Sequence, residues 1–340
     1  MRIVLDAMGS DAFPEPEVSA ALQAQSLFGD QIILVGDSAQ LKPRLEALAG
    51  PNPPVQLVHA ADMITMEDKG MQMVLKARRE NSQTSMAVGI DLIKKGEADA
   101  FLTAGNTGGA MATAYYRLGV LAGVERPALS GIFPVKDGHC VVLDIGANPD
   151  CKPEHLAQFA VMGSIYAQKV LGVQTPRVGL ISNGEEEGKG NQLVKDTIPL
   201  LKSSLLNFIG GLEGKELFGG AADVAVTDGF TGNVLLKSSE AVAKLLTDVL
   251  RKELKSNPIM LLGAALARPA FNKLKKMMDP AEIGAAPLLG VNGLVFIGHG
   301  RSDTRAIVSA IRTTRQAVQA DLLSALKEAI QAQLSQVPNA

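Results

Sequence analysis

The sequence predicts an α/β fold built on a doubly wound, mostly parallel sheet, and three observations indicate it. Short apolar runs rich in Val, Ile and Leu alternate with longer segments of helical period. Residues favoured at helix N-caps or first turns follow several of these runs. The composition, with 46% hydrophobic residues, 20% charged residues and 34 glycines in 340, is typical of a glycine-rich globular protein. We therefore expect one large α/β domain over residues 1–340.

The individual elements follow from these patterns. Helix starts are marked at Pro14/Glu15, Ser38, Thr107, Pro153/Glu154, Thr231 and Ser302. The apolar runs predict strands over residues 2–7, 31–37, 55–60, 98–104, 129–135, 139–145, 177–182, 223–227 and 294–298.

Charge, cysteine content and hydropathy exclude several function classes. The 33 Lys and Arg residues are matched by 35 Asp and Glu, so the net charge of −2 lacks the basic excess that nucleic-acid binding requires. Cys140 and Cys151, the two cysteines, cannot form a disulfide scaffold or a zinc cage, which favours a reducing compartment. Neither a secretory signal nor a stretch of about 20 apolar residues occurs, so a cytoplasmic location is expected.

Polar, glycine-containing turns follow six of the predicted strands. Carboxyl ends of parallel strands form the ligand crevice of an open sheet, so these turns are expected to converge on one cleft. Glycine lets backbone N–H groups approach an anion, and helix N-termini favour negative charge, so a phosphate-bearing ligand is the first hypothesis. Ordinary α/β turns have the same composition, which is the alternative for any one of them. The turns cover residues 6–11, 104–109, 144–148, 182–191, 228–233 and 298–302.

Several familiar site motifs are absent, and the titratable residues leave alternatives open. The sequence contains no G-x-G-x-x-G, Walker-type or G-x-S-x-G motif, so no nicotinamide, ATP or serine-nucleophile chemistry is indicated. His299 lies between two glycines and acts either at the site, as a base or as a hydrogen-bond donor to phosphate, or as a structural histidine. Lys189 and Lys237 are either anion ligands or solvated lysines. The acidic residues of the turns, Asp6, Asp11, Asp144 and Asp228, are either turn caps or Mg²⁺ ligands.

In order along the chain, the motifs resemble those of the bacterial phosphate acyltransferases, the acyl-acyl carrier protein:phosphate transacylases of phospholipid synthesis. The sequence departs from that family's pattern at Ser10, Asn183 and Ala285, and Ser10, in place of a second glycine, has the most consequence for the first turn. The motifs are Asp6-Ala-Met-Gly, Ala104-Gly-Asn-Thr-Gly, Arg126-Pro-Ala, Asp144-Ile-Gly-Ala-Asn, Glu185-Glu-Glu-Gly-Lys-Gly-Asn, Asp228-Gly-Phe-Thr-Gly-Asn-Val, Ala286-Pro-Leu-Leu-Gly and His299-Gly-Arg-Ser.

The resemblance implies an activity, an architecture and partners. Inorganic phosphate attacks the thioester of long-chain acyl-acyl carrier protein and gives acyl phosphate, without a cofactor or metal. The implied fold is a Rossmann-like three-layer α/β structure related to phosphotransacetylases. The resemblance also implies a homodimer that contacts the membrane surface. A downstream glycerol-3-phosphate acyltransferase is the expected partner.

On this basis we predict direct displacement in a ternary complex. Lys189, Lys237 and His299 are predicted to hold phosphate, with Asn106 among the donors to the oxyanion. The remaining predicted phosphate or substrate residues are Asp6, Gly9, Asp11, Gly105, Thr107, Arg126, Asp144, Asn148, Asn191, Asp228, Asn233 and Ser302.

A hydrophobic stretch near the C-terminal third predicts an amphipathic helical hairpin over residues 254–278, divided at Pro269. Its apolar residues and neighbouring lysines suit contact with an anionic membrane, and a dimerisation arm is the alternative. The predicted membrane residues are Ile259, Leu262, Leu266 and Phe271.

Two further questions stay open from sequence. The acidic carrier protein needs a basic dock, for which Lys76, Arg78 and Arg79 or the cluster at 268–276 are candidates. One competing function is that of a decarboxylating dehydrogenase of related architecture, and nicotinamide binding would reveal it. The other is a non-catalytic membrane scaffold for lipid enzymes, but this function leaves the polar turns unexplained.

Overall fold

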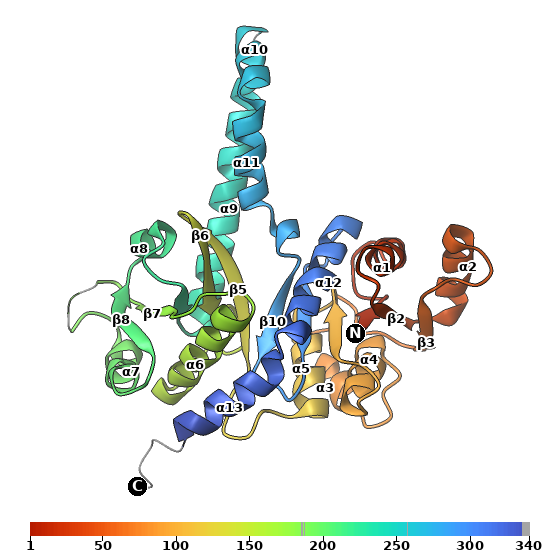
Figure 1. Cartoon of the computed structure of the whole chain (residues 1–340), viewed down its shortest axis with the longest axis horizontal. Coiled ribbons are helices and arrows are strands. Elements are labelled where there is room, and N and C mark those ends of the chain that lie inside the picture. The colour runs from red at the N-terminus through yellow and green to blue at the C-terminus, as the bar shows by residue number, and fades with distance from the viewer. Residues whose placement is uncertain (185, 187, 257, 335–340) are drawn as a thin grey trace.

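An eleven-stranded mixed sheet is the centre of the molecule (Figure 1). The computed structural model describes residues 1–334 except 185, 187 and 257. In the described residues the strands lie in the order β3-β2-β1-β4-β11-β10-β5-β6-β9-β7-β8. They are β1 (Arg2–Asp6), β2 (Gln31–Gly36), β3 (Gln56–His59), β4 (Ala100–Thr103), β5 (Ala128–Val135), β6 (Gly138–Leu143), β7 (Arg177–Ile181), β8 (Asn207–Leu212), β9 (Val224–Val226), β10 (Ala285–Leu289) and β11 (Val295–Gly298).

The strand directions divide the sheet into two parts. Seven of its pairings are parallel, which confirms the mostly parallel sheet, and the three antiparallel ones are β11–β10, β10–β5 and β5–β6. Consequently β1, β4 and β11 run one way, whereas β6, β9 and β7 run the other way. The carboxyl ends of these two groups of strands therefore lie at opposite edges of the sheet.

Helices cover both faces of the sheet, and each face has its own apolar core. Phe296 and Leu143 belong to one core, whereas Phe101 and Val142 belong to the other. This arrangement confirms the Rossmann-like layered architecture. The helices are α1 (Glu15–Phe28), α2 (Ser38–Ala49), α3 (Gly70–Arg78), α4 (Ser85–Lys94), α5 (Thr107–Leu118), α6 (Pro153–Lys169), α7 (Gln192–Lys202), α8 (Gly214–Gly219), α9 (Gly229–Leu254), α10 (Pro258–Leu266), α11 (Arg268–Met278), α12 (Thr304–Gln319) and α13 (Leu322–Leu334), with the 3-10 turn η1 (Pro280–Glu282).

The predicted strands all occur, but the sequence patterns missed β8 and β10. The glycines Gly210 and Gly211 interrupt the apolar run of β8, and β10 contains Pro287. A proline is tolerated in β10 because the strand is short and tertiary pairing holds it between β11 and β5. β10 runs opposite to both of its neighbours, β11 and β5, and the lasting change of strand direction comes at the β5–β6 pairing.

The predicted hairpin is part of a longer arm that projects from the body (Figure 1). Its ascending limb is the second half of α9, a 26-residue helix that reaches Leu254, and α10 and α11 follow it. The prediction of an arm that starts at residue 254 was wrong in extent, because α9 continues unbroken from the body. Within the described residues, no helix combines the length and the hydropathy needed to cross a membrane.

Candidate active site

The turns that follow β1, β4 and β11 pack together at one edge of the sheet, and we call them the first turn cluster (residues 6–11, 103–107 and 298–302). Asp6 is fully buried and accepts hydrogen bonds from the Met8 N–H (3.0 Å) and the Thr103 hydroxyl (2.7 Å). Thr103 Oγ1 accepts the Gly105 N–H at 2.9 Å. Burial raises the pKa of Asp6, and the Thr103 hydroxyl opposes that rise. A buried carboxyl thus organises two of the three turns.

Glycine is required where these turns touch. A Cβ on Gly9 would lie 2.7 Å from the Gly105 nitrogen, which is closer than real Cβ contacts allow. The Asp11 N–H donates to the Gly300 carbonyl at 2.7 Å, which joins the third turn to the first. The predicted residues Asp6, Gly9, Asp11, Gly105, His299 and Ser302 therefore come together here.

Asn106 and Thr107 begin α5 beside this cluster. The Asn106 Oδ1 caps the helix by accepting the Gly109 N–H at 2.9 Å. Its Nδ2 donates to the carbonyls of Thr65 (2.9 Å) and Asp68 (3.0 Å). Both amide hydrogens are thus engaged in holding the loop before α3, which argues against the predicted role of Asn106 as an oxyanion donor in this conformation. Thr107 is exposed in the first turn of α5.

The turns around the starts of β5 and α9 and the end of β6 form the second turn cluster (residues 126–129, 144–148 and 227–233). Asp144 is fully buried, and its carboxylate accepts five N–H donors. Burial raises the pKa of Asp144, and these donors oppose the rise by solvating the charge. The donors are the backbone N–H groups of Leu129, Gly146, Ala147 and Asn148 and the Asn148 Nδ2, at 2.7–3.1 Å.

The remaining predicted residues of the second turn cluster, apart from Arg126, also contact other parts of it. Asn148 Nδ2 donates to the Pro127 carbonyl at 2.7 Å as well as to Asp144. Asp228 caps α9 by accepting the Thr231 N–H (2.8 Å) and hydroxyl (2.9 Å). Asn233 lies against Gly146, and Arg126 is exposed. In the described structure, Asp144 and Asp228 therefore act as turn and helix caps.

A group on α9 connects the two clusters. Lys237 Nζ lies 3.1 Å from one oxygen of Glu240, and His299 Nε2 lies 3.8 Å from the other. Burial lowers the pKa of His299, and the Glu240 carboxylate opposes that change. Sequence reasoning missed Glu240, although its position three residues after Lys237 places both side chains on one helix face. From Asn233 to Glu240, α9 advances about 10 Å at 1.5 Å per residue.

The loop before α7 forms a separate turn. Asn191 caps α7 by accepting the Val194 N–H at 2.9 Å, and Lys189 is exposed. The Gly190 N–H donates to Asn183 Oδ1 at 2.8 Å, which gives that unusual asparagine a turn-closing contact. Glu185 and Glu187 of the resembling motif lie outside the described residues.

The six turns were expected at the carboxyl ends of strands that run one way, and they do not all lie at one edge of the sheet. Strands β6, β7 and β9 run opposite to β1, β4 and β11, so their turns lie at the other edge. Instead, α9 starts in the second turn cluster and carries Lys237 and Glu240 to His299 of the first. The sequence did not reveal this because strand direction depends on which strands pair in the sheet, and no local pattern specifies the pairing.

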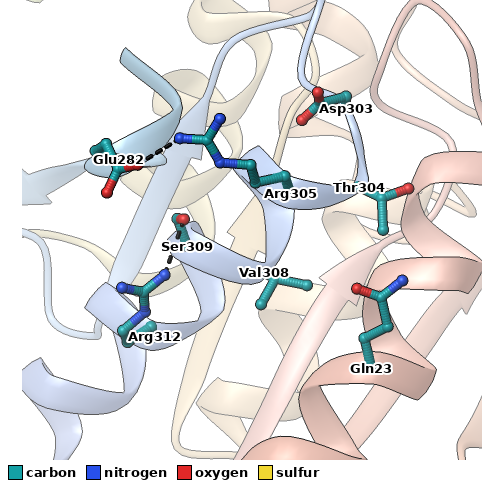
Figure 2. Close-up of a pocket in the computed structure, with 8 residues that line it drawn as sticks. All are labelled: Gln23, Glu282, Asp303, Thr304, Arg305, Val308, Ser309 and Arg312. Atoms are coloured by element: carbon teal, nitrogen blue, oxygen red, sulfur yellow. Dashed lines mark hydrogen bonds and ion pairs between the residues drawn. The ribbon is translucent and has the colours of Figure 1, made fainter. Parts of the chain in front are cut away.

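A shallow groove of about 500 Å³ lies elsewhere, between α1, α12 and η1 (Figure 2). Figure 2 shows Arg305 reaching Glu282 and Arg312 reaching the Ser309 hydroxyl, the latter at 3.0 Å. None of the predicted site residues lines this groove. Among the described residues, no three His, Cys, Asp or Glu side chains are arranged to hold a metal ion.

Comparison with known sequences gives consistent matches over nearly the whole chain. The sequence model of the family described as "Fatty acid synthesis protein" matches residues 1–325. The phosphate acyltransferase of Acidobacterium capsulatum is 48% identical over 315 residues, which is 92% of each chain. The phosphate acyltransferase of Elusimicrobium minutum is 46% identical over 331 residues, covering 97% of this chain and 96% of the relative.

Solved structures resemble the chain in fold. A phosphotransacetylase from Staphylococcus aureus has a TM-score of 0.61 at 17% identity, and one from Streptococcus pyogenes has 0.62 at 17%, each covering 94% of both chains. A 4-hydroxythreonine-4-phosphate dehydrogenase from Klebsiella pneumoniae has a TM-score of 0.53 at 13% identity, covering 94% of this chain and 99% of that one. At these identities the likeness concerns the fold alone.

Proposed function

The chain belongs to the fatty acid synthesis protein family that includes the bacterial phosphate acyltransferases, and from this membership we propose its substrates, site and surfaces. It is an acyltransferase that transfers an acyl group to phosphate for phospholipid synthesis. The observation that carries this function is the match over nearly the full length, which includes both turn clusters and α9.

We propose that the acyl donor is long-chain acyl-acyl carrier protein and that the reaction is a direct displacement. A phosphate oxygen forms a bond to the thioester carbonyl carbon, the C–S bond breaks, and the leaving sulfur takes up the electron pair and a proton. Thiolate is a tolerable leaving group, so orientation of phosphate and stabilisation of the oxyanion supply most of the catalysis.

The group on α9 supports a phosphate position beside His299. The Lys237 ammonium is a point charge for an anion, and Glu240 keeps it next to the imidazole. His299 is neutral at pH 7 because burial lowers its pKa, so it can accept the proton that phosphate carries. Lys189 and Asn191 lie in the turn before α7, and their contact with substrate remains a proposal.

The cysteines support displacement without a cysteinyl acyl-enzyme. Burial raises the pKa of both Cys140 and Cys151 to about 12, so neither thiol is ionised at neutral pH. We expect no exchange between labelled carrier protein and acyl-acyl carrier protein when phosphate is absent. Rapid exchange would indicate an acyl-enzyme and contradict direct displacement.

The test of the function is phosphate-dependent release of carrier-protein thiol from palmitoyl-acyl carrier protein, with and without EDTA. Release that requires phosphate and is insensitive to EDTA is expected. Lys237→Ala should raise the KM for phosphate about tenfold, because a charge-assisted contact is lost. Lys244→Ala, an exposed lysine on the same helix, is the matched control. Release without phosphate, or equal effects of the two variants, would contradict the proposal.

We propose that the arm joins two copies of the chain and that its tip contacts anionic membrane. On the limb formed by α9, Val242 (54% exposed), Leu245 (61%) and Val249 (50%) recur at helical spacing and expose an apolar face. At the tip, Ile259, Leu262 and Leu266 are 80%, 64% and 78% exposed, with Arg268 exposed beside them, whereas Phe271 is half-buried.

Two pairs of substitutions separate these roles. Leu262→Glu with Leu266→Glu should abolish flotation with phosphatidylglycerol vesicles and leave the dimer intact in light scattering. Leu245→Glu with Val249→Glu should give a monomer. Unchanged vesicle binding in the first variant, or an unchanged dimer in the second, would refute the corresponding role.

For the carrier protein we propose a dock at Arg78 and Arg79. Both are exposed at the end of α3, and the Arg78 guanidinium lies 5.9 Å from the ring centroid of the exposed Tyr116. Lys76 is less available, since it pairs with Asp68 at 2.9 Å. Arg78→Glu with Arg79→Glu should raise the KM for acyl-acyl carrier protein and leave that for phosphate unchanged. The downstream glycerol-3-phosphate acyltransferase remains the proposed consumer of acyl phosphate.

A further inference from the structure

Glu17 is a buried carboxyl that none of the reaction steps uses. It lies in the first turns of α1, and its side chain is 0% exposed. Its Oε1 accepts the backbone N–H of Ser10 at 3.2 Å. Its Oε2 and the Ser10 Oγ are buried without a hydrogen-bond partner among the described residues. Burying a carboxyl with so few hydrogen-bond partners costs folding free energy. If this position served stability alone, an apolar residue would be favoured here.

The contact of Glu17 falls on the turn that defines the first turn cluster. Ser10 follows Gly9, where a Cβ would lie only 2.7 Å from the Gly105 nitrogen, and precedes Asp11, whose N–H donates to the Gly300 carbonyl. Asp6 fixes the start of the same turn through the Met8 N–H. Glu17 thus holds the later part of the turn through Ser10, as Asp6 holds its start.

Among the residues that the structure describes, no cation forms an ion pair with Glu17. The charged group that acts on it is the Asp6 carboxyl, which has the same sign. Burial raises the pKa of Glu17, and the hydrogen bond from the Ser10 backbone N–H opposes that rise. The contact that Glu17 makes to the first turn cluster is therefore the hydrogen bond that it accepts from the Ser10 N–H.

We propose that Glu17 is a positioning residue for phosphate: through the Ser10 N–H it clamps the 6–11 turn against the turns at Gly105 and Gly300. This inference rests on the proposed acyl transfer to phosphate. It assigns Glu17 no contact with the substrate. Ser10 contributes the clamped N–H, and its hydroxyl fills the space beside the carboxyl.

The decisive variant is Glu17→Met, which fills a similar volume and removes the buried carboxyl. It should fold at least as well as the parent in thermal unfolding and yet raise the KM for phosphate about tenfold. The KM for acyl-acyl carrier protein should change less than about twofold. Glu17→Gln keeps an oxygen that accepts the Ser10 N–H, so it should restore the phosphate KM to within about threefold of the parent.

Val18→Ala is the matched control. Val18 is buried on the same helix, and among the described residues it makes no hydrogen bond to the 6–11 turn. It should lower the midpoint of thermal unfolding and leave the phosphate KM unchanged. An unchanged phosphate KM in Glu17→Met, or an equal rise in Glu17→Gln, would overturn the clamp.

Hydrogen exchange provides a readout that does not depend on activity. Mass spectrometry of the purified full chain can monitor hydrogen exchange of the backbone amides in residues 8–11. The exchange rate should rise about tenfold or more in Glu17→Met and should not rise in Glu17→Gln. If the parent shows no phosphate-dependent activity, the proposed function fails while exchange still tests the contact. If the parent is active and exchange is equal in both variants, the proposed role of Glu17 is wrong and the proposed function stands.

Discussion

The two turn clusters contain the same residue types, Asp and Asn among glycines, but satisfy them differently. In the second, the Asp144 carboxylate accepts five N–H donors, and Asp228 caps α9. In the first, the Ser10 hydroxyl has no hydrogen-bond partner among the described residues, and the His299 imidazole makes a long contact of 3.8 Å to Glu240. A saturated cluster stabilises structure, whereas an unsaturated one retains hydrogen-bonding capacity for a ligand.

This difference assigns separate tasks to the two edges of the sheet. The second turn cluster fixes where α9 begins, and the helix then places Lys237 and Glu240 beside His299. Substitutions in the second cluster should therefore act on folding stability, and substitutions in the first on catalysis.

The largest effect is expected from Gly232→Ala. A Cβ at this position would overlap the Asp144 carbonyl oxygen, a backbone atom that cannot move aside as the end of a flexible side chain can. We expect a loss of about 3 kcal/mol or more in the free energy of unfolding in urea. Gly263→Ala on the arm, where a Cβ meets nothing within 4 Å, should be neutral or slightly stabilising. Equal stabilities would show that the second cluster is not tightly packed.

Asp144→Asn should have the next largest effect. The amide that replaces one carboxylate oxygen repels the N–H groups it faces, so the free energy of unfolding should fall by about 3 kcal/mol. The phosphate KM, corrected for the folded fraction, should stay within about twofold. A large rise in KM without loss of stability would place Asp144 in the chemistry instead.

His299→Gln tests the first cluster through pH. Burial lowers the pKa of His299, so the imidazole is neutral at pH 7 and becomes protonated only below its ordinary value of about 6.5. The variant should lose about tenfold in kcat/KM, equivalent to about 1.4 kcal/mol. As the pH falls below 6.5, the parent should lose activity more steeply than the variant, which keeps only the dependence due to phosphate itself. Parallel pH profiles would contradict a proton-accepting role.

The smallest effect is expected from Asp228→Asn. Asparagine caps helices about as well as aspartate, so the free energy of unfolding should change by less than about 0.5 kcal/mol. Asp228→Ala should cost about 1 kcal/mol. A tenfold loss of activity in Asp228→Asn at unchanged stability would mean that the second cluster also holds substrate.

Local patterns were sufficient for much of the fold. The nine predicted strands occur because buried parallel strands read as continuous apolar runs, and most helix starts lie within two residues of the predicted positions. β10 was missed because Pro287 and small residues give it no strand pattern. Glu240 and Glu17 were missed because an acidic residue on a helix reads as solvent-exposed until packing shows what it faces.

The sequence by itself determined the layered α/β class, the positions of the polar turns and, through motifs in order, the family. These depend on local periodicity and on residue identity. The tertiary structure alone decided that strand direction changes between β11 and β6, that the turns divide between two edges and that α9 connects them. Strand direction, the partners of a buried carboxyl and the contact between Glu240 and His299 arise from residues far apart in the chain, which no local pattern specifies.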